Sequence, residues 1–257
     1  MSIRRIWVVA TNVFRSVVRD RVLYLLGLFT LILLLASRLL PEISSVAAEK
    51  TLIDLGLAAI AVFSLVVTLF VGSGLINREI EQRTVFTALS KPLSRSEFII
   101  GKHLGLSAVT AVLIGTMGLV YLLLLQSYGI DFDWRYMGLT LLFLLLELAL
   151  LNAFALLFGV STSSLLATLL TLAIYITGHL SPDVVKLAQL TDNPGLQQAV
   201  KGLYLVLPDL SQFNLRNDSV YGIFPATPTL IATAAYGVAY TVFILMLSSL
   251  IFSKKEF

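Results

Sequence analysis

The sequence of 257 residues contains no cysteine and few charged residues. Without cysteine the chain can form no disulfide, no thiolate nucleophile and no cysteine-ligated zinc or iron–sulfur site. Charged residues make up 13% of the chain, well below the roughly 25% of an ordinary soluble domain. A formal net charge of +3 is too small for a basic nucleic-acid binder, so we expect no nucleic-acid partner.

In contrast, 58% of the residues are hydrophobic, and they gather in six long runs. A bilayer core needs roughly 20 apolar residues in a helix, and continuous runs favour helices over an alternating β-barrel. The sequence therefore predicts an all-α polytopic membrane protein with a single transmembrane domain over residues 1–257. The six predicted spans are Val22–Leu40, Leu55–Ile76, Leu104–Leu125, Met137–Val160, Leu165–Leu180 and Thr229–Phe252.

The distribution of lysine and arginine predicts the orientation of these spans. Six spans put both termini on one side of the membrane, and twelve of the 18 basic residues fall on that side. Cytoplasmic loops carry the excess of basic residues, so we expect both termini in the cytoplasm. The excess of basic over acidic residues is then explained by membrane topology and does not indicate that the protein binds an acidic ligand.

The first 21 residues predict an amphipathic helix. Ile6, Ala10, Val13 and Val17 fall on one helical face, and Arg4 and Arg15 fall on the other. We expect this helix to lie in the cytoplasmic membrane interface. Two alternatives are an arginine-rich extension of the first span and a signal peptide.

The loop at residues 77–103 is the most informative segment on the cytoplasmic side. Pro92 ends a helical pattern, and Ser94 with Glu97 reads as a capping box that begins the helix of the third span. Before the proline lies a short apolar stripe, Val85, Phe86 and Leu89. A short amphipathic helix between two spans is a part of the chain that a cytoplasmic motor protein could bind, and its movement would be passed to both spans. Equally, it could be a surface loop that rests on the bilayer.

The motif in this loop is Glu81-x-x-Thr84, then Leu89-Ser90-Lys91-Pro92-Leu93-Ser94-Arg95, then Phe98 and Gly101-Lys102. It resembles the cytoplasmic loop of type 2 ABC transporter permeases. The resemblance implies a coupling helix that sits in a groove of a separate ATPase subunit, a second permease subunit, and a bacterial-type plasma membrane. The residues that match the coupling region are Glu81, Thr84, Val85, Phe86, Leu89, Lys91, Pro92, Arg95 and Phe98.

No nucleotide-binding motif of the type G-x-x-x-x-G-K-[ST] occurs in the sequence. We therefore expect no catalytic residue, cofactor or metal in this chain, and ATP with Mg²⁺ at the partner ATPase. The function implied is a permease subunit that couples ATP hydrolysis to translocation, as an exporter. A secondary transporter driven by an ion gradient and a non-transporting scaffold are the alternatives; a secondary transporter typically shows internal repeats, and no convincing one is seen.

Glu147 lies near the middle of the fourth predicted span and is the candidate residue of a translocation path. It could be protonated, face a polar path, pair with a cation or form a hydrogen bond between helices. Arg38 lies near the outer surface, so a direct pair with Glu147 would require a tilted helix. His179 and Asp183 are too few for a metal site, and His103 is expected on the opposite side from His179.

Two further features concern packing and the outer surface. Ser107, Ala111 and Gly115 form a stripe of small residues suited to close helix contact. The long external segment 181–228 contains Leu207-Pro208-Asp209-Leu210-x-x-Phe213-Asn214, which is similar to a pattern in one subset of these permeases. In that family the segment forms short re-entrant helices. From sequence alone it could equally lie on the outer leaflet.

Overall fold

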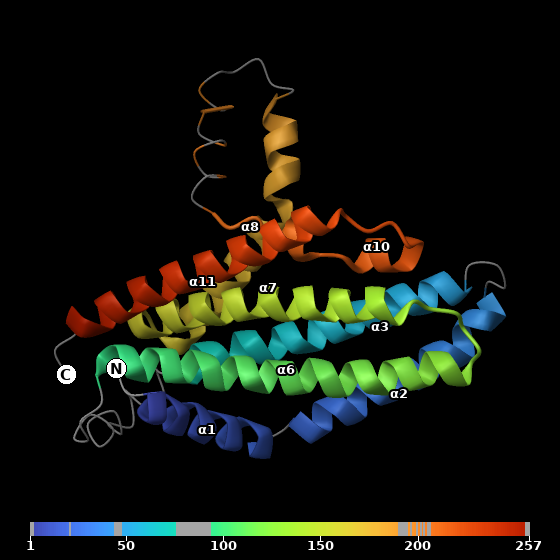
Figure 1. Cartoon of the computed structure of the whole chain (residues 1–257), viewed down its shortest axis with the longest axis horizontal. Helices are drawn as coiled ribbons and strands as arrows, with labels where there is room; N and C mark the ends of the chain where they lie inside the picture. Colours follow the sequence, from blue (N-terminus) through green and yellow to red (C-terminus); the bar gives the residue numbers. More distant parts are fainter. Residues whose placement is uncertain are drawn as a thin grey trace.

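The computed structural model describes residues 3–20, 22–43, 48–75, 94–189 and 207–254, with single positions 195, 197, 198, 200, 202 and 204. Every regular element in these ranges is helical (Figure 1). The elements are α1 (Ile3–Asp20), α2 (Val22–Ile43), α3 (Ala48–Val67), a π-helical turn η1 (Thr68–Gly72), α6 (Arg95–Ser127), α7 (Trp134–Ser161), α8 (Ser164–Gln189), a 3₁₀ turn η2 (Ser211–Phe213), α10 (Arg216–Tyr221) and α11 (Thr227–Lys254).

Five helical stretches within the described residues are long and apolar enough to cross a membrane. They are Glu49–Leu75, Arg95–Ser127, Trp134–Ser161, Ser164–Ala188 and Thr227–Lys254. The first predicted span falls in α2, where the apolar helical stretch Leu26–Leu39 is shorter. The described residues are thus helical, with several helices that suit a membrane, as predicted, and the count of six spans stays a prediction. The helices run past the predicted bounds, most clearly α8, which continues through Pro182.

The start of α6 has the capping box that its sequence predicts. The Ser94 hydroxyl accepts a hydrogen bond from the Glu97 amide at 3.2 Å, and the Glu97 carboxylate accepts one from the Ser94 amide at 3.0 Å. Two of the amides that a helix start leaves unpaired are thereby satisfied. The predicted amphipathic helix before Pro92 falls in residues 76–93, outside the described part of the chain.

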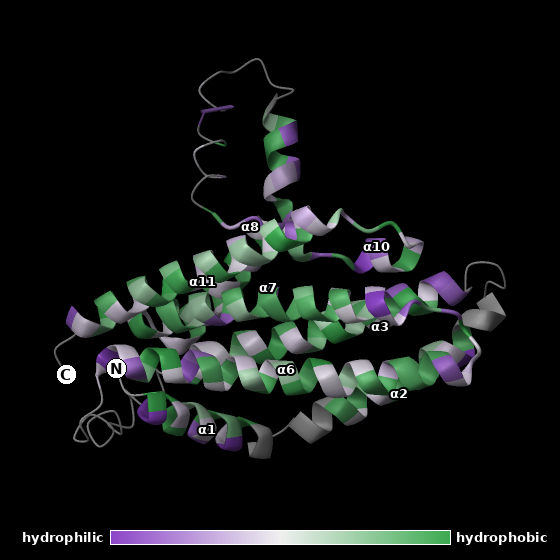
Figure 2. Ribbon diagram, viewed as in Figure 1, coloured by the Kyte–Doolittle hydropathy of each residue, from purple (hydrophilic) through white to green (hydrophobic). Residues whose placement is uncertain are grey.

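Helices α3, α6 and α7 run side by side along the molecule, with α11 against α7 (Figure 1). Apolar residues cover most of their length, and hydrophilic residues gather toward the helix ends (Figure 2). Tyr121 of α6 is fully buried, and its hydroxyl donates to the Ile53 carbonyl of α3 at 2.9 Å. A bilayer offers no water to a buried phenol, so this bond fixes α6 against α3.

Helix α1 packs along the first part of α6. Ala10, Val13 and Val17, on the predicted apolar face, are buried, with Val13 and Val17 packed beside Val109 of α6. The helices can approach closely because α6 carries glycine at the contact. A Cβ atom at Gly105 would lie 2.6 Å from the Ala10 carbonyl oxygen.

Gly115, the last residue of the predicted stripe, makes no close contact with the described part of this chain, since a Cβ atom added there would meet nothing within 4 Å. The close approaches on α6 are at Gly101 and Gly105, against α1, and at Gly118, where Leu141 of α7 lies. Within this chain, the glycines that allow close packing of α6 are therefore others than Gly115.

A Gly105→Ala substitution should loosen α1, because the added methyl overlaps backbone and α1 must move. We expect a net destabilisation of about 1–3 kcal/mol, partly offset by the better helix propensity of alanine. Hydrogen exchange of α1 amides in detergent would report it as faster exchange. The matched control is Gly115→Ala, which should leave exchange unchanged; equal behaviour of the two variants would contradict the packing of α1 on α6.

Candidate functional site

The start of α6 is joined to the last turn of α11. The Arg95 guanidinium donates to the carbonyls of Phe252 and Ser253 at 2.7 and 2.9 Å. The rings of Phe98 and Phe252 stack with centroids 5.6 Å apart. A guanidinium is well suited to the last carbonyls of a helix, which lack partners within the helix. Arg95 and Phe98, both predicted coupling residues, thus contact α11.

The same region brings the two ends of the described chain together. Arg5 of α1 lies 4.0 Å from the Glu97 carboxylate, close to where Arg95 holds the end of α11. Figure 1 shows both termini at this end of the bundle. We call it the terminal end. The other predicted coupling residues, Glu81, Thr84, Val85, Phe86, Leu89, Lys91 and Pro92, belong to the segment that joins η1 to α6 and lie outside the described residues.

Glu147 is buried in α7, with 4% of its surface exposed, and it pairs with His179 of α8. The imidazole Nε2 lies 2.8 Å from the carboxylate Oε1. Burial of an unpaired carboxylate in an apolar medium is costly, and a hydrogen-bonded partner lowers that cost. Of the alternatives that the sequence left open, the structure has an interhelical pair, with a partner that sequence reasoning did not select.

The two histidines contact different groups of α7. His103 Nε2 of α6 lies 3.0 Å from the Ala149 carbonyl, whereas His179 contacts the Glu147 carboxylate. Their placement on opposite sides of the membrane stays a prediction. Sequence reasoning missed the Glu147–His179 pair because the predicted end of the fifth span at Leu180 put His179 at the surface, whereas α8 extends to Gln189.

A small cavity of about 50 Å³ lies beside the Glu147–His179 pair. Its polar lining is Thr140, Glu147, Tyr175, His179, Asn214 and Arg216, and its apolar lining includes Leu57, Leu141, Leu144, Leu148 and Phe213. The volume suits a few water molecules or one small head group. We call this space the Glu147 cavity. Residues 213–216 form part of its wall.

Pro182 leaves a carbonyl of α8 without its helical partner, and the segment that leads to residues 213–216 binds there. Proline has no amide hydrogen, so the carbonyl four residues earlier, at Gly178, loses its helical partner. The Leu210 amide donates to that carbonyl at 3.1 Å, and the Ser181 hydroxyl donates to it at 3.2 Å. Gly178 also leaves room for the fully buried Leu210, since a Cβ atom there would lie 2.6 Å from Leu210 Cγ.

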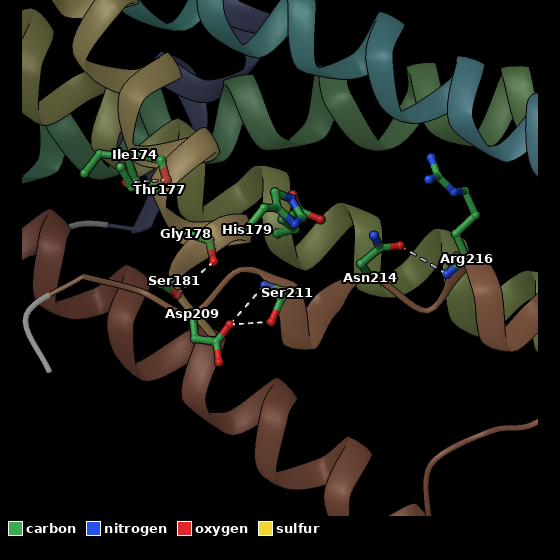
Figure 3. Close-up of polar contacts among 10 residues, drawn as sticks. Ile174, Thr177, Gly178, His179, Ser181, Asp209, Ser211, Asn214 and Arg216 are labelled. Carbon is green, nitrogen blue, oxygen red and sulfur yellow. Dashed lines mark hydrogen bonds and ion pairs between the residues drawn. The ribbon is translucent and has the colours of Figure 1, made fainter. Parts of the chain in front are cut away.

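Asp209 holds the docked segment in shape. Its carboxylate accepts hydrogen bonds from the Ser211 amide at 3.1 Å and from the Ser211 hydroxyl at 2.6 Å (Figure 3). It also accepts hydrogen bonds from the Gln212 amide group at 2.9 Å and from the Tyr204 hydroxyl at 3.1 Å. Its own amide donates to the Tyr236 hydroxyl of α11 at 3.1 Å. Such bonds to a charged group are about twice as strong as neutral ones. We call residues 207–216 the outer cap.

The outer cap also contacts α3, α7 and α11. Phe213 is 1% exposed and fits against Gly237 of α11, where no side chain obstructs it. Thr140 of α7 donates to the Leu215 carbonyl at 3.3 Å. Arg216 Nε lies 2.9 Å from Asp54 of α3, an ion pair without the alignment of a hydrogen bond. The outer cap therefore packs on several helices, and both the re-entrant and the outer-leaflet arrangement of the segment stay predictions.

Two groups outside the spans have shifted pKa values. Burial, and then the hydrogen bond to Asp209, raise the pKa of the Tyr204 phenol. Burial raises the pKa of Asp218 in α10. Tyr204 is therefore a donor to Asp209 throughout the neutral pH range, and the outer cap keeps this bond.

Asp183, which the sequence grouped with His179, does not reach it. Asp183 is exposed and pairs with Lys186 at 3.2 Å. Among the described residues, no group of three or more His, Cys, Asp or Glu side chains could hold a metal ion.

An Asp209→Asn substitution should loosen the outer cap without removing its volume. The amide offers one acceptor oxygen where the carboxylate offered two, and each bond to the charge is worth about 1.5–3 kcal/mol. We expect the Ser211 amide to exchange with solvent about tenfold faster or more. Asp183→Asn, on the exposed face of α8, is the control; an unchanged Ser211 amide in Asp209→Asn would mean that the carboxylate does not organise the cap.

Comparison with known proteins identifies the family. The model of one family, described as ABC-2 family transporter protein, matches residues 7–257. No curated protein matches the chain. The match covers nearly all of the sequence, including the segment with the predicted coupling motif, α6, α7 and the outer cap. The chain belongs to the ABC-2 family of transporter proteins.

Proposed function

We propose that this chain is the membrane-spanning permease subunit of an ATP-driven exporter. Membership of the ABC-2 transporter family supports this, together with the apolar helices that suit a bilayer. ATP and Mg²⁺ act at separate ATPase subunits, and the chain itself performs no catalysis. It works with a second permease subunit, identical or paralogous, in a bacterial-type plasma membrane.

One observation carries the coupling part of this proposal. The segment between η1 and α6 contains the predicted coupling motif, and the helix that leaves it is fixed to two other elements. Arg95 holds the end of α11, and Glu97 faces Arg5 of α1. A push on residues 81–92 would therefore move α6, α11 and α1 together, because α6 is one continuous helix from Arg95 to Ser127.

The predicted coupling residues then divide into two groups. Phe86 and Leu89, with their neighbours in the motif, contact the ATPase. Arg95 and Phe98 transmit the movement to α11, since their side chains contact its last turn. Interdigitated, hydrogen-bonded contacts of this kind pass on a displacement because packed interfaces deform little.

The topology has six spans with both termini in the cytoplasm. The start of α1 and the end of α11 lie at one end of the bundle in Figure 1, which supports an even number of spans. Helix α1 lies at the cytoplasmic interface with lipid. Its exposed Trp7 suits the headgroup region, and Arg4 and Arg15 suit anionic lipid.

Co-purification of an ATPase tests this function most simply. The wild-type chain, purified from native membranes, should bring an ATP-hydrolysing subunit with it, and a Phe86→Asp/Leu89→Asp variant should lose it, because charges replace the apolar contact. The control is the charge-swapped pair Asp183→Lys/Lys186→Asp on the opposite side of the membrane, which should retain the ATPase.

Helical content and thermal unfolding must match wild type for the comparison to count. If a folded wild-type chain brings no ATPase, the permease function fails. Dependence of transport on an ion gradient would then favour a secondary transporter.

A further inference from the structure

We propose that the Glu147 cavity binds the protonated amine of an amphiphilic substrate, with Glu147 as its counter-ion. The inference rests on the proposed function, because it treats the cavity as part of the translocation path. It adds the class of substrate: an apolar body that carries a primary or secondary ammonium group. The substrate's N–H replaces the imidazole of His179 as the donor to Glu147.

The cavity holds one buried acid in a mainly apolar wall. Glu147 is 4% exposed, and leucines from α3 and α7 surround the space beside it. In such surroundings a carboxylate attracts a cation strongly, since there is little water to screen the charge. An anion would meet the same charge at close range and be repelled.

The other charges at the cavity already have partners. The Arg216 guanidinium is directed toward α3, where its Nε lies 2.9 Å from Asp54 (Figure 3). The Asp54 carboxylate therefore offsets the positive charge of Arg216 at the cavity. His179 is the group that a ligand must displace, because its Nε2 lies 2.8 Å from the carboxylate.

The position of His179 allows its side chain to move away from Glu147 when a ligand binds. Its side chain is 21% exposed, against 5% for Glu147. It lies on α8, where Ile176 and Leu180 are about half exposed, so one face of the helix has few contacts with the described part of the chain at this level. The carbonyl of the preceding residue, Gly178, accepts a hydrogen bond from the Leu210 amide of the outer cap. Movement of His179 would therefore be transmitted to the outer cap through this hydrogen bond.

Two aromatic rings complete the site for a cation. Tyr175 and Phe213 both line the cavity, and the Tyr175 ring packs edge-on against His179 with centroids 4.6 Å apart. Aromatic faces attract ammonium groups, more strongly where water is excluded. The cavity of about 50 Å³ accepts the ammonium head; the hydrocarbon body lies along the apolar helix faces.

Binding to the purified chain in lipid nanodiscs tests this without any ATPase, so its outcome is independent of the co-purification result. The probes are four amphiphiles with the same tail: dodecylamine, dodecyltrimethylammonium, dodecanol and dodecyl phosphate. Affinity should be highest for dodecylamine, which can donate a hydrogen bond to the carboxylate, and lower for the quaternary ion, which cannot. The neutral and anionic probes should bind about tenfold more weakly or worse.

Two variants should change the affinity for dodecylamine in opposite directions. Glu147→Gln removes the counter-ion and should weaken dodecylamine binding about tenfold or more. His179→Ala removes the competing donor and should tighten it. Asp183→Asn, one helical turn from His179 and exposed, is the control and should bind as wild type. A purely structural role of the pair predicts weaker binding in both variants, so the sign for His179→Ala separates the two accounts.

Three results would overturn the proposal. They are equal affinity for dodecanol and dodecylamine, tighter binding of dodecyl phosphate, and unchanged amine binding in Glu147→Gln. Thermal unfolding of each variant in the same nanodiscs establishes that it is folded. If Glu147→Gln is unfolded, the result for His179→Ala decides alone.

Discussion

The carbonyl of Gly178 is the point on which the arrangement of the far end of the molecule depends. Pro182 removes the amide that would have paired with this carbonyl inside α8, and a bilayer supplies no water in its place. The Leu210 amide donates to the Gly178 carbonyl in its place. A proline that would weaken an isolated helix thus leaves a free carbonyl to which the outer cap binds. Gly178 also helps the outer cap to pack on α8, because the absence of a side chain leaves space for Leu210.

The same constraint explains the pair in the interior. Glu147 is buried among apolar residues, and His179, one position after Gly178, satisfies it. The docking carbonyl and the partner of the buried acid are thus neighbours in the chain. A shift of this part of α8 would alter both the closure of the cavity and the pairing of Glu147. At the terminal end, Arg95 connects α6 to α11, and α11 carries the glycine on which Phe213 of the outer cap rests.

The sequence predicted what depends on local chemistry. Apolar length identified the membrane helices, and the capping box at Ser94 and Glu97 was recognisable because its two bonds join residues three apart. It did not predict contacts that depend on how helices face one another. The stripe at Gly115 and the contact at Gly105 differ only in which face of α6 meets a neighbour.

Glu147 was identifiable as a candidate site because an acid within an apolar run stands out, but its partner was not. His179 was assigned to the surface because the apolar run ends at Leu180, whereas the helix continues through a proline whose lost bond the outer cap replaces. A proline four residues after a glycine, followed later by a short apolar motif with an acid, was the available signal. It could not be interpreted without knowing that Leu210 folds back onto α8.

The most direct test of this account follows the opening of the Glu147 cavity during ATP hydrolysis. The chain has no native cysteine, so Thr140→Cys places a single thiol on the cavity wall at a position that is 6% exposed. With the ATPase present, a membrane-impermeant maleimide applied from the outside should label this thiol slowly without ATP and much faster during turnover. A labelling rate that is the same with and without ATP, in a complex that hydrolyses ATP, would contradict the account.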